Sequence, residues 1–298
     1  MQDSGSATHT QLLNAGVIEA AAFQKIHPKE FHRQFHEQKC RPDGRGLSAM
    51  RKLHVAPNAV KSADGSCLVK LGHTTVVCGL KLEVGKPYDT APKDGRLVVA
   101  VSLSPLCSPN FHLGKASEKS TLATSSWGNA LNHELCSTKM ISLSELCISE
   151  RESSWVVFAD VVCLDYDGNV RDAALLAVVN ALKTCRDVCF TRAVRLPDTK
   201  VADDGEVFVL PGGGVHSIKV RQHPVPTTVA VIDDLLVADP TAEEEELARG
   251  TVTVCYNEKN QICSMFKPGG ISISDAQLKE CLAMAKKRTK DVLALMKV

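Results

Sequence analysis

Two runs of strands and helices, separated by a proline- and glycine-rich segment, constrain the fold of this chain most strongly. The first run ends in an alanine-rich helix predicted over Asp172–Cys185, and the second ends in an amphipathic helix predicted over Asp275–Met296. Between them stands Pro211-Gly-Gly-Gly214, which favours a flexible connection over a phosphate-binding loop. An α+β fold of two similar halves is therefore predicted.

The strands are predicted from alternating apolar residues and from runs rich in β-branched side chains. In the first half they are 51–55, 66–71, 74–82, 97–103 and 154–164, and in the second half 216–221, 227–232, 235–238, 251–257 and 262–266. A further helix is predicted over Lys115–Leu135, and a short one begins at Ala242. A chain of 298 residues can bury a sizeable core in such a fold.

The N-terminal region is predicted to be helical from Leu12 to Gln38, with a break at Pro28. His32, His36 and Cys40 fall at i, i+4 and i+8, a spacing that would suit a metal ion. A fourth ligand is missing from the neighbouring sequence, so we expect exposed histidines on an amphipathic helix and no metal site.

Charge is balanced overall but uneven along the chain. The 35 basic and 34 acidic residues give a formal net charge of +1, so any contact with nucleic acid must use a local patch. Residues 279–298 hold six bases and two acids, whereas residues 222–248 hold seven acids and no Lys or Arg. These runs are either solvated faces or contacts with a polyanion or with charged neighbouring subunits.

The chain has 12 cysteines without a C-x-x-C pair, which argues against a zinc ribbon and a thioredoxin-type site. Many of these cysteines stand in apolar runs, where a thiol behaves as a small hydrophobic group. Neither a secretory signal nor an apolar run long enough to span a bilayer is visible, so we expect the cytosol, the nucleus or both, and no membrane partner.

The acidic stretch Asp239–Glu246 is the strongest catalytic candidate by residue type. Carboxylates one helical turn apart could hold Mg²⁺ or act as general acid and base. The same residues also suit the first turn of a capped helix, because Thr241 and Glu244 have capping-box spacing and acids complement the helix dipole. The local pattern favours this structural interpretation.

Several motifs in one order resemble the RNase PH family. They are Arg41-Pro-Asp-Gly-Arg45, Ala63-Asp-Gly-Ser66, Leu71-Gly-His-Thr74, Val76-Val-Cys-Gly79, Leu164-Asp-Tyr-Asp-Gly-Asn169, Asp172-Ala173 and Val237-Ala-Asp-Pro-Thr241. The last three are similar to the branch of eukaryotic RNA exosome ring subunits that lost activity. Ser104-Pro-Leu-Cys-Ser108, Leu146-Cys-Ile-Ser149 and Arg221-Gln-His-Pro-Val225 narrow the resemblance to one subunit of that ring.

The resemblance implies an RNase PH-like fold of two β-α halves, each like the second domain of ribosomal protein S5, in a six-membered ring. It places a loose extension at residues 1–27, the first half with its N-terminal helix at 28–210 and the second half at 211–298. In active relatives an arginine-rich helix and loop bind phosphate, and a pair of aspartates supports acid catalysis and metal binding. Here residues 111–131 contain no arginine, Asp239 remains, Pro240 interrupts the pattern, and Glu245 replaces the second aspartate.

These departures predict a subunit without catalytic residues, metal or cofactor, in which Asp239 and Glu245 are degenerate active-site positions. The expected partners are other RNase PH-like ring subunits, RNA-binding cap subunits and single-stranded RNA, in the nucleus, including the nucleolus, and in the cytoplasm. Arg96, His112, Lys115 and Lys119 are the candidate RNA contacts. Two alternatives stay open: a phosphate-dependent 3′-exoribonuclease active on its own, and a metal-dependent phosphoesterase using Asp239 and Glu245.

Overall fold

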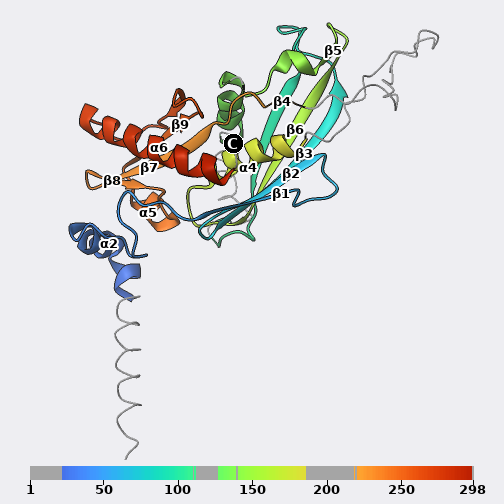
Figure 1. Ribbon diagram of the computed structural model, residues 1–298. Coiled ribbons are helices and arrows are strands. Elements are labelled where there is room, and N and C mark those ends of the chain that lie inside the picture. The colour runs from blue at the N-terminus through green and yellow to red at the C-terminus, as the bar shows by residue number, and fades with distance from the viewer. Residues whose placement is uncertain are drawn as a thin grey trace, which may run out of the picture. The chain divides into compact units, whose positions relative to one another are not determined.

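The computed structural model describes residues 22–109, 111, 127–138, 140–185, 218 and 220–296 (Figure 1). It divides the chain into two units, residues 1–50 and residues 51–298, and each is described by itself. None of the helices within these ranges is long and apolar enough to cross a membrane.

In the first unit the predicted break at Pro28 is confirmed. Residues 22–26 are helical, His27 is not, and helix α2 spans Pro28–Glu37. Proline lacks a backbone N–H, and the first turn of a helix is where that group has no intrahelical acceptor. Pro28 therefore ends one helix and begins the next.

The expectation of exposed histidines on this helix is wrong, because His32 and His36 are both buried. The rings of Phe31 and His32 meet edge to face with centroids 5.8 Å apart. The ring centroids of Phe31 and Phe35 are 5.1 Å apart and those of His32 and His36 are 6.0 Å apart, so these side chains form one aromatic group along α2.

The first sheet belongs to the second unit and carries most of the core. Its strands are β1 (Leu53–Pro57), β2 (Gly65–Leu71), β3 (Thr74–Gly85), β4 (Arg96–Leu103), β5 (Cys147–Ser149) and β6 (Ser153–Asp165), and a 3-10 helix, η1, spans Leu143–Leu146. The order is β1-β2-β3-β6-β4, with β5 paired to β6. Strand β4 runs parallel to β6, and the other pairings are antiparallel.

Helix α4 (Val170–Thr184) follows β6 and is buried on nearly every side. Its alanines at 173, 174, 177 and 181 are fully buried, and such small side chains let a helix lie close to a sheet. The helix contacts β2 and β3 of the first sheet and β7 of the second, and Figure 1 shows it between the two sheets.

The second sheet has the order β10-β9-β7-β8 and is covered by helix α6. Its elements are β7 (Val225–Ile232), β8 (Leu235–Ala238), α5 (Ala242–Leu247), β9 (Gly250–Tyr256), β10 (Ile262–Phe266) and α6 (Asp275–Leu295). Every residue of β7 is buried, because α4 and α6 both contact it. Cys281 and Ala285 of α6 pack into the apolar clusters of this sheet.

One predicted strand is wrong at its described residues. Ile218, Val220 and Arg221 have no strand structure, although the alternation of apolar residues over 216–221 predicted one. Ile218 is buried, and the backbone N–H of Arg221 donates to Met140 O at 2.8 Å. The apolar pattern here reflects burial of an irregular segment, since periodicity reports burial and not pairing.

The predicted helix over 115–135 is described only in part. Residues 127–137 are helical, whereas residues 115–126 lie outside the described ranges, as do the segments 1–21 and 211–214. The first strand begins two residues later than predicted, at Leu53. Arg51 lies before it because its backbone N–H donates to a side chain, as described below.

Candidate functional site: the buried carboxylate cluster

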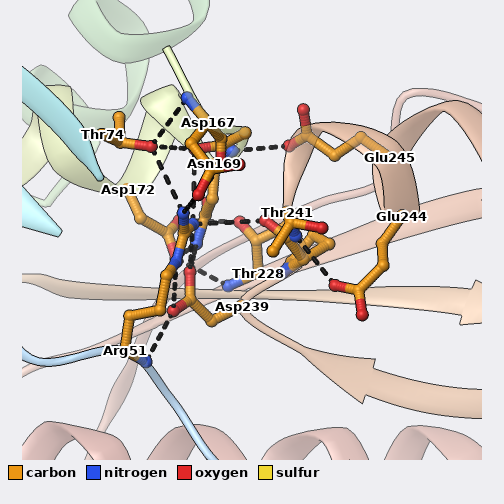
Figure 2. Close-up of polar contacts among 12 residues, drawn as sticks. Arg51, Thr74, Asp167, Asn169, Asp172, Thr228, Asp239, Thr241, Glu244 and Glu245 are labelled. Atoms are coloured by element: carbon orange, nitrogen blue, oxygen red, sulfur yellow. Dashed lines mark hydrogen bonds and ion pairs between the residues drawn. The ribbon is translucent and has the colours of Figure 1, made fainter. Parts of the chain in front are cut away.

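Asp239 lies where the first and second halves of the fold meet, directly after β8. Its carboxylate accepts a forked pair of hydrogen bonds from Arg51, at 3.0 Å from Nε and 2.8 Å from Nη2 (Figure 2). The backbone N–H of Arg51 donates to the same carboxylate at 2.8 Å. Both side chains are buried, so this is a two-point ion pair shielded from water.

The other donors of Arg51 hold the turn between β6 and α4. Its Nη1 donates to the backbone oxygen of Asp167 at 2.6 Å, and Nη2 donates to Gly168 O at 3.3 Å and Pro240 O at 3.2 Å. Each guanidinium nitrogen is thus engaged with protein atoms. The single side chain of Arg51 joins β1, the β6–α4 turn and the β8–α5 segment.

Opposing effects act on the pKa of Asp239. Burial alone would raise it, but the hydrogen bonds and positive charge of Arg51 outweigh burial and lower the pKa below its ordinary value. Burial likewise opposes the charge of Arg51, and Asp239 keeps the pKa of Arg51 above its ordinary value. Both groups are therefore charged at neutral pH.

A second carboxylate, Asp172, extends this network into the second sheet. It accepts hydrogen bonds from the backbone N–H of Thr228 at 2.9 Å, the Thr228 hydroxyl at 2.7 Å and Asn169 Nδ2 at 3.0 Å. Burial raises the pKa of Asp172 in spite of these donors. We call Arg51, Thr74, Asp167, Asn169, Asp172, Thr228 and Asp239 the carboxylate cluster.

Glu245, in α5, has different partners. It accepts hydrogen bonds from the Tyr166 hydroxyl at 3.0 Å and from the backbone N–H of Asn169 at 2.8 Å. Burial raises the pKa of Glu245, while these two donors act in the opposite direction. Asn169 also donates from Nδ2 to Asp239 at 2.7 Å, so Asn169 lies between the two predicted carboxylates.

The predicted helix start at Thr241 is confirmed. Helix α5 begins at Ala242, and Glu244 accepts a hydrogen bond from the backbone N–H of Thr241 at 2.8 Å. This is the reciprocal arm of a capping box, and it removes Glu244 from any set of free carboxylates.

Arg96 does not lie with the carboxylate cluster. It pairs with Val156 where β4 begins, whereas Leu103, where β4 ends, pairs with Cys163 close to the β6–α4 turn. That length of strand rises about 23 Å at ~3.3 Å per residue. The Arg96 guanidinium instead lies over the ring of Tyr88, 4.8 Å from its centroid. The other candidate RNA contacts, His112, Lys115 and Lys119, lie outside the described residues.

Several cluster residues were not predicted from the sequence as site residues, notably Arg51, Asn169 and Asp172. In the sequence, residues 165–169 stand out only as part of a family motif. Its left-handed residues, Gly168 at φ 73° and Asn169 at φ 53°, aim Asn169 at both Asp239 and Asp172. Two sequence signals together could have located the cluster: the motif at residues 165–169 and the acidic segment Asp239–Glu246.

A smaller buried group lies between α4 and the second sheet. Glu134 accepts hydrogen bonds from Arg171 Nη2 at 2.9 Å, from the Cys255 thiol at 2.6 Å and from the Ser264 hydroxyl. The Arg171 guanidinium lies 3.7 Å from the centroid of the Phe266 ring. These contacts tie residues 127–137 and α4 to β9 and β10.

Two family models match most of the described chain. Domain 1 of the 3′ exoribonuclease family, named RNase_PH, matches residues 49–186. Domain 2 of the same family matches residues 223–288.

Full-length relatives and solved structures agree with these matches. The chain is 32% identical to the exosome complex component rrp43 of Schizosaccharomyces pombe, over 89% of this chain and 94% of that protein. It is 34% identical to the exosome complex component Rrp42 of Archaeoglobus fulgidus, over 81% of this chain and 85% of that protein.

A structure titled as the Archaeoglobus fulgidus exosome with RNA bound to the active site matches with a TM-score of 0.73 at 29% identity, over 90% of this chain and 97% of that chain. Rice Rrp46 matches with a TM-score of 0.59 at 15% identity, over 85% of this chain and 98% of that chain, which supports the fold alone. The α+β fold and the resemblance predicted from the sequence are confirmed. The chain belongs to the 3′ exoribonuclease family of RNase PH-like proteins.

Proposed function

We propose that this chain is a ring subunit of an RNA exosome, which holds its neighbours in place and does not cleave RNA itself. The names of its relatives support the exosome assignment. The proposed absence of catalysis rests chiefly on one observation. Both oxygens of the Asp239 carboxylate accept hydrogen bonds from Arg51, so the residue that remains of the family's carboxylate pair serves as a structural joint.

The arginines expected to bind the attacking phosphate in a phosphorolytic reaction are also missing. A phosphate that attacks a phosphodiester needs positive groups to offset the repulsion between two anions. Residues 111–131 contain no arginine, and two lysines do not reproduce a bidentate arginine fork. Arg51 does not replace such a clamp, because its guanidinium donates to Asp239 and to backbone oxygens.

The metal-dependent alternative is disfavoured by the same geometry. A divalent cation held by Asp239 and Glu245 would have to displace Arg51 from one carboxylate and Tyr166 from the other. Displacing Arg51 would leave a guanidinium buried and unpaired, which costs several kcal/mol. We therefore assign neither residue to catalysis.

The ring role predicts stable association with an RNase PH-like sister subunit. An obligate interface buries a large apolar area, so the complex should persist at micromolar concentration. Light scattering of the co-expressed pair should give one species with the summed mass of the two chains. Two separate monomers would contradict the ring assignment.

Asp239→Asn should leave the rate of RNA degradation per assembled ring unchanged, because degradation belongs to other subunits. The substitution removes the partner charge of Arg51, so fewer rings are expected to assemble, and the rate must be normalised to assembled complex. Asp233→Asn, in the β7–β8 turn, is the matched control for loss of one acid. A normalised rate that falls for Asp239→Asn alone would show that Asp239 takes part in catalysis.

The isolated chain provides the complementary product test. Incubation with single-stranded RNA, phosphate and Mg²⁺ should release nothing. Nucleoside diphosphates would support the phosphorolytic alternative, and monophosphates would support the phosphoesterase.

Arg96 remains our proposed RNA contact, together with His112, Lys115 and Lys119. Its support is an exposed aromatic ring, Tyr88, under the guanidinium, a pairing that suits a single strand, whose bases can stack and whose phosphates attract cations. Reversing Arg96 and Lys115 to Glu in an assembled ring should weaken RNA binding and lower the salt slope by about 1.4, since each phosphate contact contributes about 0.7. The Lys61→Glu/Lys70→Glu pair is the control with the same change of charge. Equal affinities and slopes for both pairs would contradict the contact.

We extend the proposal to RNA-binding cap subunits as partners and to the nucleus and cytoplasm as compartments. Its support is the similarity to a eukaryotic exosome component over most of both chains. Fractionation of cells that express a tagged chain, together with identification of co-purifying proteins, would test both parts.

A further inference from the structure

The exposed side of α6 carries a row of lysines that neither the core nor the proposed ring role explains. Lys279, Lys286 and Lys290 follow one side of the helix, with Lys287 beside them, and all four are exposed. The opposite side is buried against β7 and β9 through Cys281, Ala285, Thr289 and Val292. We call these four lysines the α6 ridge.

The ridge is unneutralised within the described part of the chain. None of its four ammonium groups forms an ion pair there, although Asp275, Glu280 and Asp291 lie on the same helix. Ala283 separates Lys279 from Lys286 on the exposed side, so no acidic or bulky side chain interrupts the row. From Lys279 to Lys290 the helix rises about 17 Å at ~1.5 Å per residue, which gives a rigid track of positive charge.

Charge complementarity identifies the class of ligand. The chain as a whole carries only +1, whereas residues 279–298 hold six bases and two acids, so this ridge is a local attraction for anions. A row of separate ammonium groups without an aromatic side chain suits repeated phosphates and offers nothing that reads bases. We infer that the α6 ridge binds the phosphate backbone of single-stranded RNA without regard to its sequence, at a surface apart from Arg96 and from the carboxylate cluster.

This inference rests on the proposed function only in naming RNA as the polyanion. The contacts of α6 support a separate surface, since α6 covers the second sheet and Arg96 begins β4 in the first sheet. Truncating these side chains should therefore affect RNA binding without disturbing the core.

The test compares two double charge reversals in the isolated full-length chain. Lys286→Glu/Lys290→Glu alters the ridge, and Lys61→Glu/Lys259→Glu makes the same change of charge at exposed lysines elsewhere. Binding of a labelled oligouridylate is measured by fluorescence anisotropy over a series of salt concentrations. The ridge variant should bind about tenfold more weakly, with a salt slope smaller by about 1.4, while the control stays close to wild type.

Other outcomes would overturn the inference. Unchanged affinity and slope in the ridge variant, or equal losses in both variants, would mean that the ridge has no specific part in RNA binding. Tight binding of polyglutamate by the wild-type chain, lost in the ridge variant while oligouridylate binding is kept, would assign the ridge to an acidic protein.

Two controls keep the result interpretable. If the charge-reversed ridge variant fails to fold by circular dichroism, Lys286→Ala/Lys290→Ala replaces it and must still lower the salt slope by about 1.4. Light scattering with a sister subunit is a separate readout. If the wild-type chain does not associate with the sister subunit, the ring role is contradicted, but the RNA measurement remains valid. If only the ridge variant fails to associate, the ridge is a contact between subunits.

Discussion

Replacing Arg51 with Met should lower the free energy of unfolding of the full chain by about 3–5 kcal/mol, the usual cost of removing one partner from a buried ion pair. The lost side chain donates to Asp239 from two nitrogens and also holds the backbone oxygens of Asp167 and Gly168. Its removal leaves the Asp239 carboxylate buried without its counter-charge. Chemical denaturation, followed by circular dichroism, measures the loss.

Two comparisons make this prediction specific. Arg249→Met breaks an exposed ion pair with Asp233 and should cost no more than about 1 kcal/mol. The double variant Arg51→Met/Asp239→Leu should recover part of the loss, since replacing both partners leaves neither charge of the pair buried without the other. A loss for Arg51→Met no larger than that for Arg249→Met would mean that the ion pair does not hold the halves together.

The same pair predicts how stability depends on pH. The folded-state pKa of Asp239 lies below its ordinary value of about 3.9, so its contribution is complete above that value and is lost as pH falls through the folded pKa. As pH falls through this pKa, the free energy of unfolding of the wild type should therefore decrease relative to that of Arg51→Met/Asp239→Leu. Asp172 and Glu245, whose pKa values are raised, act in the opposite direction but are present in both proteins.

Gly168→Ala should be the second most damaging substitution, with a loss of about 3 kcal/mol. Gly168 has φ 73°, where a non-glycine residue is strained by about 1–3 kcal/mol. An added Cβ would also lie 2.5 Å from the backbone N of Ala242 and from the carbonyl carbon of Thr241. The β8–α5 segment would have to move, which would pull Asp239 and Glu245 away from Arg51 and Asn169. Thermal and chemical unfolding would measure the loss.

Gly44→Ala is the matched control for strain alone. Its φ is 80°, and nothing lies within 4 Å of the position where its Cβ would be. It should cost only about 1 kcal/mol, the strain of a left-handed residue without a clash. If both alanine variants lost the same free energy of unfolding, the close approach of the Gly168 position to Thr241 and Ala242 would not contribute to the loss.

The sequence alone located most of the local structure. Strand patterns placed β2, β3, β6 and β8 close to their observed bounds, and the capping spacing of Thr241 and Glu244 placed the start of α5. These predictions hold because they depend on neighbours within a few residues. The family motifs also predicted the fold, because each motif lies within a short segment and the motifs follow one another in the order of the family.

Only the tertiary structure decided what the acidic segment does. By sequence, Asp239 was a catalytic candidate or an acid at a helix start, and local spacing could not choose between buried and solvated carboxylates. Its partner Arg51 lies 188 residues away, and Asn169 lies 70 residues away. The pairing arises when α4 and the two sheets close around the β6–α4 turn. Whether a carboxylate is free to do chemistry depends on which donors fold onto it, and that is a property of long-range packing, which no local pattern encodes.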